Sequence, residues 1–160
     1  MTRIYGLSLG GAWAVDKVSL NTPANTTILS LMRINEEISY TTYSGGTIGD
    51  WFVEYLKNTL ISILHDEDII GMDSIRFHHV KEVSTTIKKS DKYLTLLYLS
   101  PYSSDFNPIE IMWLKIKSVL RMLKIRDNTM LLSAIKTAFS KIIPLDCFGW
   151  FSTVRLVSVI

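Results

Sequence analysis

The chain has 160 residues, a length that suits one domain with one hydrophobic core. Hydrophobic residues make up 48% and charged residues 20%, which excludes an intrinsically disordered chain. The formal net charge of +2 favours a nucleic-acid partner only weakly. The single cysteine, Cys147, cannot form an internal disulfide, so we expect it to be a small buried apolar residue in a reducing compartment.

The sequence predicts no membrane association. No apolar run reaches the ~20 residues that a membrane-spanning helix needs. The first fifteen residues contain Tyr5, Ser8 and three glycines, which make a poor apolar core for a signal peptide. We therefore expect a cytoplasmic protein.

The first half of the chain predicts strands followed by one helix. Gly10 and Gly11 indicate a turn, and residues 21–25 form a loop with Pro and Asn residues. Apolar side chains then return at helical spacing from Phe52 to Ile63. The expected elements are strands over residues 12–20, 26–34 and 38–43, then a helix over residues 48–64 with Thr47 as its N-cap.

Strands and helices alternate in the second half, which predicts parallel strands with helices packed on their faces. Pro108 stands at the first position of a helix, where proline is favoured, and Pro144 is expected to end the last helix. The expected elements are strands over residues 69–72 and 93–99 and helices over residues 80–89, 108–124 and 128–142. Antiparallel strands followed by parallel ones predict an α/β fold, an RNase H-like mixed sheet flanked by helices, although this order does not fix a function.

Two carboxylates stand where such a sheet holds its ligands. Asp73 directly follows a short apolar strand, and Glu110 lies in the first turn of the helix that follows the next strand. The carboxyl ends of parallel strands meet at one edge of the sheet, so these side chains can converge. Carboxylate oxygens suit Mg²⁺. The alternative left open by the spacing alone is an Asp in a strand-to-helix loop and a Glu that only stabilises a helix start.

The helix after Pro108 carries a basic stripe. Its apolar face is formed by residues 109, 112, 113, 116, 120 and 123, and Lys117 and Arg121 share a neighbouring stripe with Glu110, with Lys124 at its edge. Such residues could hold a DNA backbone beside the acid, or could simply form a solvated face. Residues 111–126 contain no acid and five basic residues, Lys115, Lys117, Arg121, Lys124 and Arg126.

Residues 98–117, YLSPYSSDFNPIEIMWLKIK, resemble the hallmark L-P-P-Y-S-P-D-x-N-P-I-E-x-x-W-x-x-I-K of DDE-type transposases from bacterial insertion sequences and mariner-like elements. The resemblance implies that Glu110 is the third catalytic acid. Asn107, Pro108 and Trp113 support the match. The matching positions are Leu99, Pro101, Tyr102, Ser103, Asp105, Asn107, Pro108, Ile109, Glu110, Trp113 and Lys117.

Residues 70–74 resemble the family's apolar strand that ends in the second acid, which implies that role for Asp73. His78, Val80 and Lys81 match further on, and residues 1–6, MTRIYG, resemble a stretch of bacterial members. The family implies two Mg²⁺ or Mn²⁺ ions, DNA cleavage and strand transfer, transposon ends and target DNA as partners, and a bacterial, nucleoid-associated location.

The chain also departs from the family pattern. The family's first acid lies on a strand before the MTRxYG stretch, and a helix-turn-helix region precedes that strand. Neither is found here, so we expect residues 1–160 to be a partial catalytic domain without its first catalytic strand, inactive alone. The missing acid could come from an upstream-frame product or a full-length transposase. The alternative is a catalytically dead fragment that binds nucleic acid or self-associates, as a transposition regulator or a relic.

Overall fold

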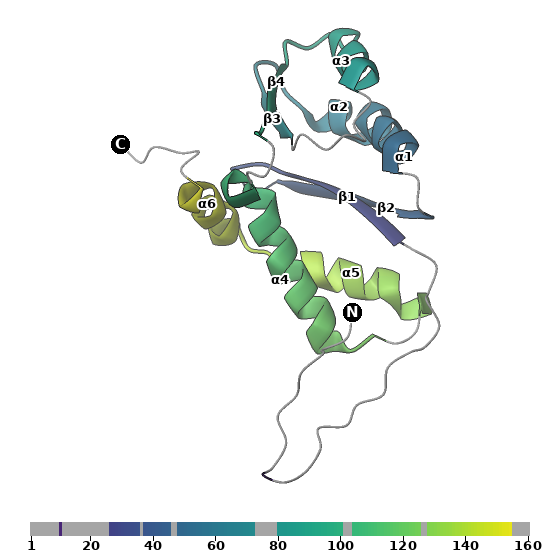
Figure 1. Ribbon diagram of the computed structural model, residues 1–160, viewed down its shortest axis with the longest axis vertical. Coiled ribbons are helices and arrows are strands. Elements are labelled where there is room, and N and C mark those ends of the chain that lie inside the picture. The colour runs from purple at the N-terminus through teal and green to yellow at the C-terminus, as the bar shows by residue number, and fades with distance from the viewer. Residues whose placement is uncertain are drawn as a thin grey trace.

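The computed structural model confirms a mixed α/β fold in which strands and helices alternate along the chain (Figure 1). Asp73, Thr47 and the strand expected over residues 12–20 lie outside the described residues. No helix in the described part of the chain is long and apolar enough to span a bilayer. The structure describes residues 10, 26–35, 37–45, 48–72, 80–100, 104–125 and 128–154.

The first two described strands form a β-hairpin, as predicted. β1 (Thr26–Met32) pairs antiparallel with β2 (Ile38–Ser44), from Thr26 opposite Ser44 to Met32 opposite Ile38. The Arg33 amide donates to the Glu37 carbonyl at 2.9 Å and closes the turn between them. Successive side chains point to opposite faces of the hairpin.

Both faces of the hairpin are buried against helices. Ile28 and Met32 lie on the face that packs against α4, α5 and α6, whereas Leu29 and Leu31 pack against the core of the helices and strands that follow the hairpin. Figure 1 shows the hairpin between these two groups of helices. On the α4 side, the Tyr40 ring stacks on Phe139 with 3.9 Å between ring centroids.

The helix expected over residues 48–64 is interrupted by a π-helical turn that the sequence did not predict. α1 (Ile48–Tyr55) leads into this turn, Leu56–Leu60, and α2 (Ile61–Ile63) completes the segment. The Ile61 amide donates to the Leu56 carbonyl, and Leu56 and Leu60 are both buried. Tyr55 is also buried, which raises the pKa of its hydroxyl to about 12.

The later strands form a second, parallel sheet. β3 (Ile69–Met72) pairs with β4 (Thr95–Tyr98), and α3 (Val80–Lys88) lies between them in the chain. Ile70 and Met72 are buried against the helices. In the described residues the two strand pairs are separate two-stranded sheets, antiparallel first and parallel second.

The carboxyl-terminal helices correct one prediction. α4 (Pro108–Leu123) has nearly the expected bounds. The helix expected over residues 128–142 begins instead with a 3₁₀ turn, Asn128–Met130, and continues as α5 (Leu131–Phe139), which ends three residues before the expected end. Pro144 does not merely end a helix; it occupies the first position of α6 (Pro144–Thr153). The Asp146 carboxylate accepts a hydrogen bond from the Ile143 amide at 2.8 Å and thereby satisfies one donor at this helix start.

A polar clamp joins the hairpin turn to the segment that enters β3. The Arg33 guanidinium donates to Asp68 Oδ1 at 2.6 Å and to the Ile63 carbonyl at 3.1 Å. Asp68 Oδ2 accepts from the His65 amide at 2.7 Å. Burial alone would raise the pKa of Asp68, but the hydrogen bonds from His65 and Arg33 and the Arg33 charge lower it.

We predict that Asp68→Asn lowers the free energy of unfolding by about 1–2 kcal/mol at neutral pH, because the clamp loses a charged hydrogen bond that is partly screened by solvent. The lowered pKa means that the wild-type contribution is present above the unfolded pKa of about 3.9 and is lost as pH falls through the folded value. Urea denaturation between neutral pH and about pH 3 should therefore show a shallower pH dependence for the variant.

The control for this prediction is the same substitution in an Arg33→Met background. The two residues share the clamp, so their effects should not add. Full additivity of the two free-energy changes would contradict the assignment of the pH dependence to the Arg33–Asp68 pair.

Candidate active site

Local hydrogen bonds fix the start of α4 and leave the Glu110 carboxylate available. Asn107 has an extended backbone with φ −106°, and its side-chain oxygen accepts from the Ile109 amide at 3.2 Å. Pro108 is buried at the first helical position, and the Glu110 amide donates to the Asn107 carbonyl at 3.1 Å. Glu110 is exposed, and no hydrogen bond or ion pair within the described residues engages its carboxylate. The Glu110 side chain therefore does not accept the hydrogen bond from the Asn107 amide that a capping box would require.

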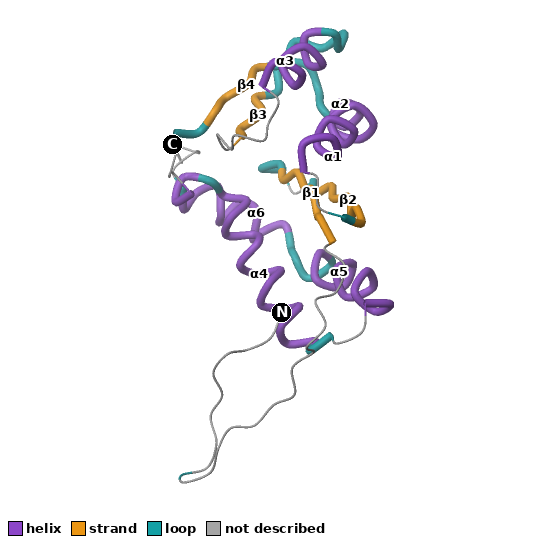
Figure 2. Tube along the Cα trace, turned by 45° about the vertical axis from the view of Figure 1, so that its right-hand side comes forward, coloured by secondary structure: helices purple, strands orange, loops and turns teal. Residues whose placement is uncertain are grey.

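The end of β3 lies beside the chain that leads to Glu110. The Leu99 amide, just past β4, donates to the Met72 carbonyl at 2.8 Å. Met72 directly precedes Asp73 in the sequence. Figures 1 and 2 both show the amino end of α4 close to the β3–β4 sheet. Asp73 itself lies outside the described residues, so its convergence with Glu110 stays a prediction.

Fewer basic residues of α4 are available to bind a ligand than the five that the sequence places in residues 111–126. Lys117 is half-buried, and Arg121 and Lys124 are exposed; Lys124 ends the helix in a left-handed conformation with φ 48°. Lys115, in contrast, forms an ion pair with Asp146 of α6 and is not free to bind a ligand. Arg126 lies outside the described residues. Within the described residues, the cations that remain on or at the edge of the basic stripe are Lys117, Arg121 and Lys124, roughly two to four turns along the helix from Glu110.

Trp113 anchors α4 to the core, as the sequence predicted. It is partly buried against the cluster formed by α4, α5 and α6, and its ring meets Phe139 edge-on with 6.1 Å between centroids. Met112 and Ile116, on the same face, are fully buried. The apolar face of α4 therefore fixes the orientation of the stripe that carries Glu110.

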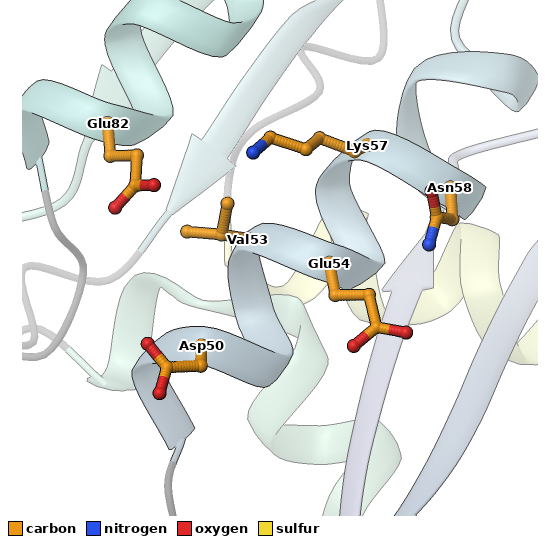
Figure 3. Close-up of a pocket in the computed structure, with 6 residues that line it drawn as sticks. All are labelled: Asp50, Val53, Glu54, Lys57, Asn58 and Glu82. Carbon is orange, nitrogen blue, oxygen red and sulfur yellow. The ribbon is translucent and has the colours of Figure 1, made fainter.

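A second group of acids does not form a metal site. Asp50, Glu54 and Glu82 line a shallow pocket with Lys57 on α1, the π-helical turn and α3 (Figure 3). Figure 3 shows the three carboxylates apart from one another, with those of Asp50 and Glu54 directed to opposite sides. Among the residues that the structure describes, no three His, Cys, Asp or Glu side chains are grouped so that they could hold a metal ion.

The comparison with protein families decides the identity of the domain. A family model described as DDE superfamily endonuclease matches residues 1–131, which include β1 to α4 and both predicted acids. The chain belongs to the DDE superfamily endonuclease family. The chain matches no curated protein and no solved structure. α6 and nearly all of α5 lie beyond the matched residues.

Family membership makes this a DNA-acting domain of a class that generally uses divalent metal ions. The exposed Glu110 carboxylate is the donor type that a hard cation such as Mg²⁺ prefers. The chemistry of this donor therefore fits the metal that the DDE superfamily endonuclease family implies, although a complete metal site is not present among the described residues.

Sequence reasoning missed the role of Lys115 and Asp146, which the structure brings together from α4 and α6. Burial alone would raise the pKa of Asp146, but hydrogen bonds from Ile143 and Lys115 and the Lys115 charge lower it. An Asp two residues after a proline is a helix-start signal, and it could have revealed α6. Its pairing with Lys115 could not have been found without the fold.

We predict that Asn107→Ala lowers the free energy of unfolding by about 0.5–2 kcal/mol, because the Ile109 amide loses its side-chain acceptor. Thermal denaturation followed by circular dichroism measures this loss. Asn107→Asp keeps a capping oxygen and should retain most of the stability. Equal destabilisation by both substitutions would show that Asn107 acts through contacts other than the cap.

Proposed function

We propose that this chain supplies the second and third acids, Asp73 and Glu110, of a metal-dependent DNA strand transferase. The observation that carries the proposal is the exposed Glu110 carboxylate in the first turn of α4, which no other described residue engages in a hydrogen bond or ion pair. The Leu99–Met72 hydrogen bond, which brings the preceding loop beside the end of β3, supports it. The match to the DDE superfamily endonuclease family supports it.

Asp73 and Glu110 would hold Mg²⁺ or Mn²⁺, with two ions in the complete site. When bound, such ions lower the pKa of an attacking water and stabilise the leaving oxygen of a phosphodiester. The other residues of this chain position Glu110 and bind DNA. The Asn107 cap and the buried face of α4 hold Glu110 at the helix start, and Lys117, Arg121 and Lys124 bind phosphate groups of the DNA on the same stripe.

The first acid of the site comes from a strand outside residues 1–160 in this proposal. Within the described residues, β1 pairs only with β2 and β3 pairs only with β4, so each has an edge that no described strand occupies. Such edges accept an added strand. An upstream-frame product or a full-length transposase would supply the strand with the first acid, and this chain alone would bind DNA without cleaving it.

The basic stripe is tested by the salt dependence of DNA binding. We expect the purified chain to be retained by duplex DNA at low salt, with a log–log salt slope that decreases by about 1 for each of Lys117→Ala and Arg121→Ala. Lys136→Ala removes an exposed cation from α5, away from the stripe, and should leave the slope unchanged. Absence of retention at low salt would contradict DNA binding by this chain.

The acids are tested by cleavage assays on transposon-end DNA with Mg²⁺ or Mn²⁺. We expect no nicking by the chain alone, and nicking after addition of a partner that carries the first acid. Glu110→Gln should reduce that activity by at least ~10³-fold, whereas Glu82→Gln on α3 should not change it. Robust nicking by the chain alone that Glu110→Gln abolishes would overturn the requirement for a partner.

A further inference from the structure

α6 is apolar on two faces, and the core of the chain covers only one of them. Cys147 is buried in the cluster that also contains residues of α4 and α5, and Trp150 and Phe151 pack against this cluster. On the other side of the helix, Leu145 is 73% exposed and Phe148 is 47% exposed. A helix that is hydrophobic all round is normally buried. One face of α6 therefore lacks a partner among the described residues.

The uncovered residues form one row along the helix, which we call the outer face of α6. Their spacing of i, i+3, i+4 and i+7 places them side by side. The four residues are Leu145, Phe148, Gly149 and Ser152. The Ser152 hydroxyl already donates to the Phe148 carbonyl at 2.8 Å, and Asp146, the one charged residue of α6, pairs with Lys115 away from this row. The outer face is therefore uncharged and mainly apolar.

Gly149 is not required by packing among the described residues. It lies in the interior of α6, where glycine is less favourable than alanine because it loses more backbone entropy on folding. A Cβ atom at this position would meet no side chain or neighbouring element within 4 Å in the described part of the chain. The outer face thus has an open space at Gly149, directly after the large side chain of Phe148.

These features suit a second copy of the same face. A symmetric dimer brings one surface patch together with its own copy, so the patch must be complementary to itself. An uncharged face meets its copy without repulsion between like charges. When two α6 helices run antiparallel, the Phe148 ring of each can fit the space at Gly149 of the other. DNA is a poorer fit, because α6 contains no Lys or Arg to bind its phosphates.

We propose that two copies of the chain associate through the outer face of α6. The ten residues of α6 span roughly 15 Å, so the interface is small and the association is weak and reversible. The inference does not rest on the proposed catalytic function. α6 lies beyond the residues that match the DDE superfamily endonuclease family, and it carries neither Asp73 nor Glu110.

Sedimentation equilibrium of the full chain, at concentrations from about 1 µM to about 1 mM, tests the proposal. We expect the wild-type mass to rise from that of a monomer toward that of a dimer. Phe148→Glu should stay monomeric over the whole range, because two carboxylates would meet in the contact. Leu145→Glu, at the most exposed position of the face, is a second variant with the same expected result. Circular dichroism verifies that both variants fold.

Gly149→Ala separates association from helix stability. The added methyl group has room within the chain and favours the helix, so the thermal midpoint should rise. The same methyl group would occupy the space for the Phe148 ring, so the dissociation constant should increase roughly tenfold. A higher midpoint with unchanged or tighter association would overturn the proposal.

The matched control is Leu132→Glu, which places the same charge at an apolar position of α5 that is 58% exposed. It should keep the wild-type equilibrium between monomer and dimer. A wild-type chain that is monomeric at every concentration would overturn the proposal. A dimer that survives both Phe148→Glu and Leu145→Glu, or one that Leu132→Glu disrupts to the same extent, would also overturn it.

Discussion

Burial of both faces of the β1–β2 hairpin is the constraint on which the rest of the structure depends. Ile28, Met32 and Tyr40 face the helices α4, α5 and α6, and Leu29 and Leu31 face the core shared by α1, β3 and α3. A hairpin of two strands has little stability in water by itself, so it needs these helices as much as they need it. The Arg33–Asp68 clamp adds directional hydrogen bonds at the turn, where apolar packing ends.

α4 transmits this packing to the candidate site. One face of the helix is packed into the core through Met112, Ile116 and Trp113. The neighbouring stripe carries Glu110, Lys117 and Arg121. The Lys115–Asp146 pair ties the same helix to α6. The backbone at the start of such a helix is held in place by packing, and catalytic groups need that kind of preorganisation.

Much of the fold and part of the candidate site could be predicted from the sequence. Short runs of apolar and β-branched residues bounded by loop residues predicted β1 and β2, and Pro108 with the helical periodicity after it predicted α4, because these signals are local. The π-helical turn at Leu56–Leu60 could not be predicted, since its apolar spacing resembles that of an ordinary helix. The ion pair between Lys115 and Asp146 depends on how α4 and α6 pack against each other, and the periodicity of the sequence does not reveal that packing. The pairing of Asp73 with Glu110 remains a prediction.

The π-helical turn has a consequence for how the chain length of this segment can vary. A π turn holds one residue more than the α-helical turn it replaces. Lys57 and Asn58 within it are exposed, while Leu56 and Leu60 on either side of them are buried. A relative that lacks one residue here could close the bulge into regular helix and keep both leucines in the core, so a single gap in this helix would be compatible with an unchanged fold.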